Sequence, residues 1–233
     1  MLPVFAVYSS FLQRCYDEII HDLSIEEQHV VIGIDRAGIV GNDGETHQGL
    51  FDVAMLSNIP KITVYSPATY AEMRWALEQS LYAHTGVCCV RYPRGGEVSL
   101  PEGFDPNKDW SMIHPGKETV LVTYGRIASE VCKAAQMLAE NGTEVSVLKI
   151  NRILPFCEEV LAQIKDAKQI LFVEEGMKNG GIGQILGEKL LEQGYQGRYQ
   201  LLAIDDCFVS QATVARAIEL SGLDAKSIVR FYE

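Results

Sequence analysis

The chain has 233 residues, of which 47% are hydrophobic and 22% charged, and its formal net charge is −11. This composition is that of an ordinary globular protein, and the length suits one large domain or two smaller ones. The acidic balance argues against nucleic acid or an anionic membrane as a partner, because both require a basic protein surface.

Two further features indicate a cytoplasmic protein. No apolar run approaches the roughly 20 residues that a membrane span requires, and the first ten residues lack the basic segment of a signal peptide. The six cysteines show no CxxC spacing, which favours buried, reduced thiols.

The first hundred residues alternate strand-like and helix-like patterns. Four apolar runs predict buried strands, at residues 4–8, 30–34, 61–65 and 86–92. Capping-box patterns that start at Ser10 and at Thr69 predict the beginnings of two helices. The unit opens directly on a strand and shows few helices around its strands, so we expect it to be an N-terminally shortened part of a larger domain.

A second alternation begins at residue 119, after a segment of different character. Residues 97–118 are rich in glycine, proline and charge, which predicts a linker between domains. The strands predicted after it are residues 119–124, 144–150, 169–175 and 199–204. The predicted helices are residues 127–140, 158–165 and 182–193 and a C-terminal stretch from Ser210.

This order of elements predicts the fold class. Strands that alternate with helices form parallel sheets covered by helices on both faces. We therefore expect an α/β protein with two consecutive parallel-sheet domains, residues 1–96 and residues 119–233.

Polar residues that follow the strands of the first unit are expected to share one rim, because ligands of open parallel sheets bind outside the carboxyl ends of the strands. These residues are Tyr8, Arg36, Asp43, His47 and Arg94, with Arg14 one helical turn past Ser10. Three arginines suit a phosphorylated or carboxylated substrate, since each guanidinium offers a planar fork of donors. A histidine beside them can transfer a proton near neutral pH.

The three arginines also have structural interpretations, and a lone histidine is usually structural. Arg14 could be a solvated helix residue, Arg36 could pair with a neighbouring acid, and Arg94 could mark the turn into the linker. His47 lies in a glycine-rich loop after a strand, which is not a typical core position, and this favours a functional role.

The loop 35–49, DRAGIVGNDGETHQG, was compared with known metal and phosphate loops. Asn42-Asp43-Gly44 resembles part of a diphosphate–magnesium motif, but its first glycine is displaced and no paired asparagines follow. The acid spacing of a calcium-binding EF-hand is absent too. The glycines of 180–183 do not complete a dinucleotide-binding GxGxxG and favour close helix–sheet or subunit packing. The sequence therefore predicts no metal site.

Seven motifs stand out along the chain: YSSFLQRCYDEIIHD, DRAGIVGNDGETHQG and VRYPRG in the first unit, and LVTYG, LKINRILPF, VEEGMKNGGIG and SGLD in the second. Together they resemble the 1-deoxy-D-xylulose-5-phosphate synthase family, a branch of the transketolase-like enzymes. The resemblance covers essentially the whole chain. It implies a shortened pyrimidine-binding domain followed by a transketolase C-terminal domain.

The resemblance implies a thiamine-diphosphate enzyme that condenses pyruvate with glyceraldehyde 3-phosphate and releases carbon dioxide, for isoprenoid, thiamine and pyridoxal synthesis. The complete enzyme uses Mg²⁺, but neither the magnesium motif nor the activating glutamate motif of the family occurs in this chain. We therefore expect the isolated chain to be inactive. It is expected to act as a homodimer or with a complementary N-terminal half.

The resemblance also implies roles for individual residues. Phe11 would lie against the aminopyrimidine ring of the cofactor. Tyr8, Arg36 and Arg94 would hold the phosphate of the acceptor aldehyde, and Arg14 and Asp43 would line the same pocket. His47 would exchange protons with the reacting oxygen of the donor or the acceptor.

Two alternatives remain open at the level of the sequence. A β-type subunit of a 2-oxo-acid dehydrogenase, or one half of a transketolase, would share the two-domain layout, although THQG after DRAG together with RYPRG favours the synthase. A non-catalytic dimerisation module is the other alternative, because the second unit shows no catalytic set of its own.

Overall fold

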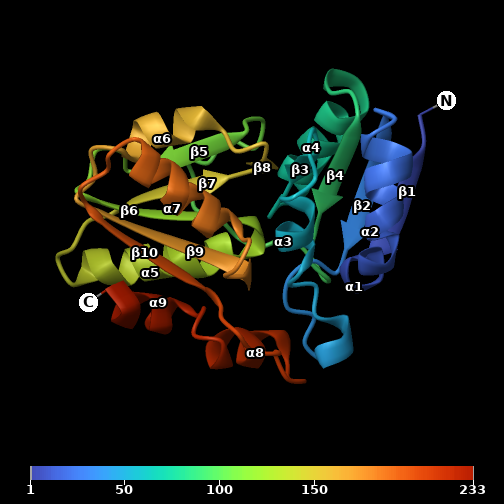
Figure 1. Cartoon of the computed structure of the whole chain (residues 1–233). Coiled ribbons are helices and arrows are strands. Elements are labelled where there is room, and N and C mark those ends of the chain that lie inside the picture. Colours follow the sequence, from blue (N-terminus) through green and yellow to red (C-terminus); the bar gives the residue numbers. More distant parts are fainter. Residues whose placement is uncertain (1, 233) are drawn as a thin grey trace.

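The computed structural model describes residues 2–232, which form two α/β domains joined side by side (Figure 1). Within these residues each domain is built on a five-stranded sheet. Both sheets are parallel except for one antiparallel edge strand, so the predicted fold class is confirmed.

The first sheet has the strand order β1-β2-β4-β3-β8. Its strands are β1 (Val4–Tyr8), β2 (Val30–Asp35), β4 (Val87–Arg91), β3 (Thr63–Tyr65) and β8 (Arg152–Leu154). The register pairs Tyr8 with Asp35 at the carboxyl ends of β1 and β2. The residues that follow these two strands therefore start from neighbouring positions on one rim.

Helices of the first domain are short or irregular. The segment after β1 consists of α1 (Ser9–Leu12), η1 (Gln13–Cys15), α2 (Tyr16–Glu18) and the π-helical η2 (Ile19–Ser24). The other helical segments are η3 (Glu45–His47), α3 (Asp52–Leu56), α4 (Tyr70–Glu78) and η4 (Gln79–Ala83). Leu12 and Ile19 are buried on the apolar face that the sequence predicts for the first helical segment.

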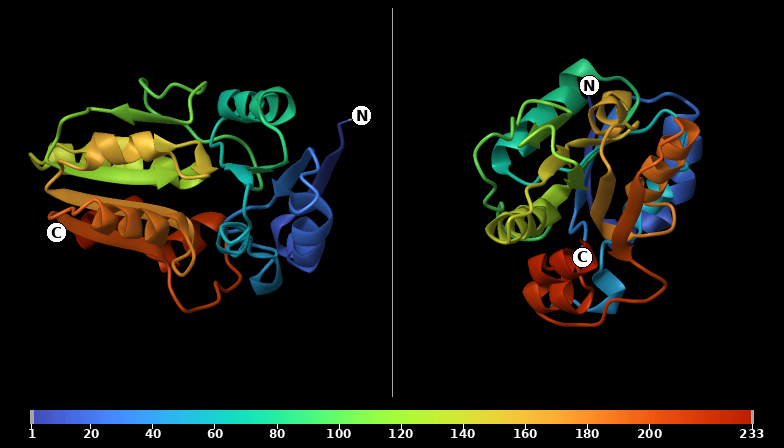
Figure 2. Two further views of the ribbon diagram at one scale, coloured as in Figure 1. Left: turned by 45° about the horizontal axis from the view of Figure 1, so that its top comes forward. Right: turned by 90° about the vertical axis from the view of Figure 1, so that its left-hand side faces the viewer.

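The second sheet has the order β10-β9-β6-β7-β5. Its strands are β10 (Arg198–Ile204), β9 (Gln169–Met177), β6 (Thr119–Tyr124), β7 (Ser146–Ile150) and β5 (Trp110–Ile113). The helical segments are η5 (Gly125–Ile127), α5 (Ala128–Glu140), α6 (Glu158–Ile164), α7 (Ile182–Glu192), α8 (Val214–Leu220) and α9 (Ala225–Tyr232). The views of Figure 2 show α8 and the first domain's loop around residue 45 lying side by side.

The structure departs from the expected linker and strand list in two places. The segment 97–118 contains β5, which pairs antiparallel with β7. β8 leaves the second domain and pairs with β3 of the first. Both strands have only three or four residues, too few to show an alternating pattern, and both depend on pairing with distant segments.

One predicted helix cap is confirmed and the other is wrong. Thr69 and Glu72 form the expected capping box at the start of α4. Ser10 does not cap, because the helix begins directly after β1 at Ser9 and thereby takes Ser10 into its first turn. Within the described residues the buried Ser10 hydroxyl has no hydrogen-bond partner.

Buried charges join the two domains. Lys149 on β7 is buried and donates to Glu72 of α4 at 2.8 Å. Burial lowers the pKa of Lys149, and the adjacent Glu72 carboxylate partly opposes this shift. Removing one member of such a pair leaves an unpaired buried charge, which costs about 3–5 kcal/mol. The contact therefore holds the domains in a fixed relation.

The glycines of 180–183 serve packing, as the sequence predicts. Gly181 precedes α7, and a Cβ on Gly183 would overlap Leu201 and lie 2.9 Å from Phe172. A side chain at this position would require Leu201 and Phe172 to move, so glycine allows the helix to pack closely against the second sheet.

None of the helices within residues 2–232 combines the length and the hydropathy that a bilayer crossing requires.

Candidate active site

Arg36 lies at the centre of the rim formed by β1 and β2. Its guanidinium carbon is 3.7 Å from the centroid of the Tyr8 ring, a cation–π contact that follows from the pairing of Tyr8 with Asp35. Arg36 also donates to Asp35 at 2.6 Å. Its backbone has φ +59°, an uncommon conformation for a residue with a side chain and one that occurs often at functional sites.

Asp43 joins the arginines of two strands. Its carboxylate accepts a hydrogen bond from Arg94 at 2.7 Å and lies 3.7 Å from Nε of Arg36. The Arg94 side chain is 46% exposed, while Arg36 and Asp43 are partly buried. Both guanidinium groups therefore keep donors that can serve an anion, and Asp43 fixes their separation.

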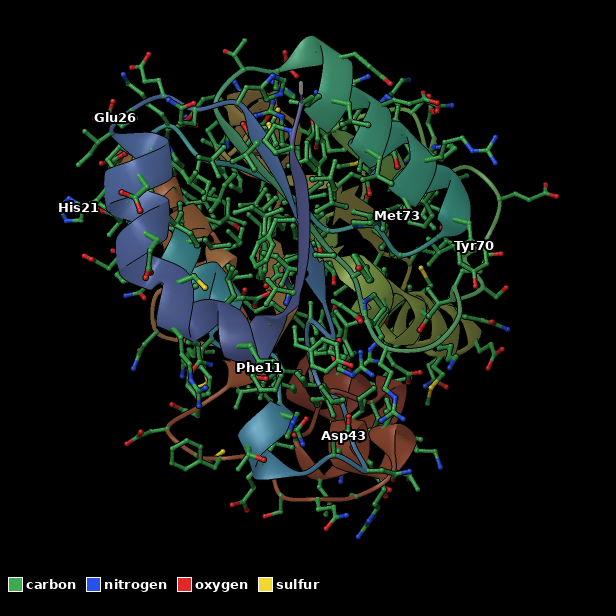
Figure 3. All side chains as sticks on the ribbon, turned by 90° about the vertical axis from the view of Figure 1, so that its right-hand side faces the viewer. Phe11, His21, Glu26, Asp43, Tyr70 and Met73 are labelled. Carbon is green, nitrogen blue, oxygen red and sulfur yellow. The ribbon has the colours of Figure 1, made fainter. Side chains whose placement is uncertain are left out.

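An aromatic group borders the arginines. The rings of Tyr8 and Phe11 stack with centroids 5.3 Å apart, and Phe11 meets the His47 ring edge-on at 5.6 Å. The Nδ1 atom of His47 lies 2.9 Å from the Thr46 hydroxyl. Among the described residues Nε2 of His47 has no hydrogen-bond partner, so it is available for a substrate oxygen. Figure 3 shows Phe11 near the N-terminal end of the helical segment that follows β1, above the loop that carries Asp43.

The structure brings together six of the seven residues singled out in the sequence. Arg14 is the exception: its side chain is exposed on η1 and makes no ion pair with any residue in 2–232. The alternative that Arg14 is a solvated helix residue therefore stays open. The pairing of Arg36 and Arg94 with carboxylates agrees with their structural interpretation and also orients them for a ligand.

Gly38 and Gly49 close the loop 35–49 at its base. The two residues exchange backbone hydrogen bonds of 2.7 and 2.8 Å in an isolated antiparallel bridge. A Cβ on Gly49 would lie 2.9 Å from the Ser9 side chain and would overlap the carbonyl oxygen of Arg36. The close packing of loop, strand end and helix start thus requires glycine at this position.

Residues that hold the loop from the second domain were not predicted. Glu175 and Arg126 contact the loop backbone at Ile39. Gln48 accepts from the backbone N–H of Val40 and donates to the carbonyl of Val209. These residues could have been found by looking for polar side chains at the carboxyl ends of the strands, as was done for the first sheet. Arg126 follows β6, and Glu175 lies near the carboxyl end of β9.

The rim offers an aromatic surface for one part of a thiamine cofactor. Phe11 is 43% exposed, so its ring can contact a planar heterocycle, and this fits the pyrimidine part of the cofactor. Within residues 2–232 no group of three or more His, Cys, Asp or Glu side chains is placed to hold a metal ion. The exposed Phe11 ring therefore suits the pyrimidine part of such a cofactor.

Two family models match the chain. "Transketolase, pyrimidine binding domain" matches residues 1–96, and "Transketolase, C-terminal domain" matches residues 108–228, more than half of the chain. The chain belongs to the transketolase family. The second match includes β5.

Curated relatives of this transketolase-family chain include proteins called 1-deoxy-D-xylulose-5-phosphate synthase. The protein of Clostridium botulinum is 37% identical over 97% of the chain, that of Listeria innocua 36% over 98%, and that of Parabacteroides distasonis 33% over 99%. The chain spans 37% of the length of each of these relatives.

Solved structures of transketolases share the fold. One described as a split-gene transketolase in an inactive β4 tetramer has a TM-score of 0.85 and 23% identity, and covers 98% of this chain and 74% of its own. A transketolase mutant from Pichia stipitis has a TM-score of 0.83 and 18% identity, and the match covers 98% of this chain and 33% of that one. At these identities the likeness concerns the fold of the transketolase-family chain.

Proposed function

We propose that the chain forms the acceptor-binding side of the active site in a thiamine-diphosphate-dependent 1-deoxy-D-xylulose-5-phosphate synthase. The substrates are pyruvate and glyceraldehyde 3-phosphate. The proposal is carried by the contacts of Arg36, Asp43 and Arg94 at one rim, with His47 beside Phe11. The curated relatives of that name, 33–37% identical, support it.

The arginines bind the phosphate of the acceptor in this proposal. Arg36 is held over the Tyr8 ring and Arg94 is held by Asp43, so both reach the rim in fixed orientations. Pre-oriented guanidinium groups lose less conformational freedom when a phosphate binds. Arg14 is proposed to line the outer part of the same pocket.

Phe11 and His47 act on the reacting end. Phe11, whose ring meets that of His47, would contact the aminopyrimidine ring of the cofactor, and Nε2 of His47 would donate a proton to, or take one from, the reacting substrate oxygen. The cofactor, when bound, supplies the decarboxylation and carbon–carbon bond chemistry. The protein contributes orientation and charge complementarity.

The residues that hold the diphosphate and Mg²⁺ come from other parts of the assembly in this proposal: a further segment of a longer polypeptide or a complementary N-terminal half. The 233 residues contain no Gly-Asp-Gly motif of the magnesium type. A polypeptide of these residues alone is therefore expected not to decarboxylate pyruvate. The solved structure described as an inactive β4 assembly of a split-gene transketolase offers a parallel.

The test uses enzyme reconstituted with the complementary half of a relative, thiamine diphosphate and Mg²⁺. Arg36→Gln and Arg94→Gln are each expected to lower kcat/KM for glyceraldehyde 3-phosphate about 10- to 100-fold, because each removes a charged hydrogen bond of about 1.5–3 kcal/mol. With unphosphorylated glyceraldehyde the same variants should differ little from the parent. Arg74→Gln, on the exposed face of α4, is the matched control.

Equal losses with both aldehydes would contradict the assignment of these arginines to the phosphate. Reconstituted enzyme that transfers a two-carbon ketol unit but does not condense pyruvate would favour the transketolase alternative. Acyl transfer to lipoamide would favour the 2-oxo-acid dehydrogenase subunit. Arg14→Gln, measured with both aldehydes, decides whether Arg14 belongs to the pocket.

A further inference from the structure

The loop 35–49 is held at one point by both members of a buried ion pair from the second domain. The Glu175 carboxylate accepts a hydrogen bond from the backbone N–H of Ile39 at 2.6 Å. Arg126 donates to the backbone carbonyl of the same residue and pairs with Glu175, its Nε lying 3.0 Å from Oε2. Both backbone groups of Ile39, the N–H and the carbonyl, are thus hydrogen-bonded to the second domain.

The pair is shielded from solvent, which gives this contact its strength. The side chains of Arg126 and Glu175 are 9% and 6% exposed. A Cβ on Gly38, the residue before Ile39, would lie 2.6 Å from the Glu175 carboxyl carbon. The carboxylate therefore fits directly against a stretch of loop backbone without a side chain. Hydrogen bonds to charged groups in such sites are stronger than neutral ones.

The second domain holds the far part of the same loop as well. Gln48 bridges Val40 to the carbonyl of Val209, and Gln211 donates to the carbonyl of Asn42 at 2.8 Å. Ser210 donates to Glu45 at 2.9 Å. These last two contacts are exposed and individually weak. Together with the Ile39 contact they surround the loop segment that presents Asp43 and His47.

We propose that Glu175 and Arg126 are positioning residues that set the placement of the loop carrying Arg36, Asp43 and His47. The proposal rests on the proposed function of that rim. It gives the C-terminal domain a part in substrate recognition, through contacts to the backbone of the loop. A loop displaced by as little as about 1 Å loses much of its catalytic contribution.

The neighbouring Glu174 provides a matched control within the same strand. Like Glu175 it is buried, but its carboxylate accepts from Tyr124 at 2.8 Å and from the backbone N–H groups of Ile182 and Gly183 at 3.1 Å each. All of these partners lie in the second domain. Substitution at Glu174 should therefore disturb the interior and the start of α7 while leaving the loop in place.

Hydrogen exchange of the full chain, followed by mass spectrometry, tests the positioning role. Glu175→Ala is expected to raise exchange in peptides that cover residues 36–50 by 10-fold or more. Glu175→Gln, which keeps an acceptor for Ile39, should raise it less. Glu174→Ala should raise exchange around Ile182 and leave residues 36–50 as in the parent. If Glu175→Ala does not fold, Arg126→Met removes the other half of the contact.

A second measurement links the loop to the rim. In the reconstituted enzyme Glu175→Gln is expected to raise KM for glyceraldehyde 3-phosphate several-fold with a smaller change in KM for pyruvate, whereas Glu174→Gln should leave this ratio unchanged. Parent-like exchange in the Glu175 and Arg126 variants, or equal effects of the Glu174 and Glu175 variants, would overturn the proposal. Because exchange needs no catalysis, the proposed function can fail independently of the positioning role.

Discussion

Two sets of ion pairs in this molecule use the same residue types in opposite ways. The exposed set, Arg36, Asp43 and Arg94, lies at the rim, where its side chains are 21–46% exposed. The buried set is the pair of Asp52 and Arg91, whose side chains are 0% and 4% exposed. Arg91 lies only three positions before Arg94 in the chain. Exposed pairs contribute little to stability and remain open to ligands, whereas buried pairs are costly to break.

Asp52→Ala tests the buried set and has the largest expected effect. Arg91 donates to Asp52 at 2.9 and 3.2 Å, so the substitution leaves a buried guanidinium without its carboxylate. The free energy of unfolding is expected to fall by about 3–5 kcal/mol in urea denaturation. Asp105→Ala, which breaks an exposed pair with Lys108, is the control. A loss below about 1 kcal/mol at Asp52 would remove the contrast between the two sets.

The buried Glu174 makes the stability of the folded chain depend on pH, which exposed carboxylates are not expected to do to the same extent. Burial raises the pKa of Glu174 to about 7 from its ordinary 4.5, and hydrogen bonds from Tyr124, Gly183 and Ile182 partly oppose the shift. Between these values the folded chain holds a proton that the unfolded chain releases. The stability from this group is therefore fully present below about pH 4.5 and is lost as pH rises through about 7.

Glu174→Gln should consequently flatten the dependence of stability on pH. Between pH 5 and pH 7.5 the parent is expected to lose about 1–3 kcal/mol more than the variant, measured by urea denaturation at each pH. The exposed Glu188→Gln provides the control. Parallel curves for the parent and Glu174→Gln would show that this carboxyl titrates alike in the folded and unfolded chain.

Asp43→Asn, in the exposed set, has the smallest expected effect on stability. Its pairs with Arg36 and Arg94 are partly solvated, so the free energy of unfolding should change by less than about 1 kcal/mol, and less still at high salt. Thermal melts at two salt concentrations measure this. A loss as large as that of Asp52→Ala would identify Asp43 as structural and would weaken its assignment to substrate binding.

The rim could be predicted from the sequence because its residues follow strand ends. Tyr8 ends a clear apolar run, Arg36 and Arg94 lie within three residues of a strand end, and parallel strands end on one side of a sheet. The helix cap at Thr69 could likewise be predicted, since a capping box depends only on residues within one helical turn.

The remaining features depend on contacts between distant segments. Ile39 and Glu175 are 136 residues apart, so no local pattern indicates that one holds the other. The short helix α3 and the strands β5 and β8 form where tertiary packing supports them, and they lack a period of useful length. Ser10 shows that a local motif can also mislead. Its capping-box pattern is present in the sequence, but the helix begins at Ser9, directly after β1, so Ser10 does not cap it.

The position of strand β8 has a consequence for how the chain folds during synthesis. It belongs by sequence to the second domain, yet it completes the edge of the first sheet beside β3. During synthesis from the N-terminus, the β3 edge of the first sheet therefore stays unpaired until residue 154 has left the ribosome. The two domains are consequently expected to acquire their final structure as one cooperative unit, and a cut in the segment between them would not release a self-contained first domain.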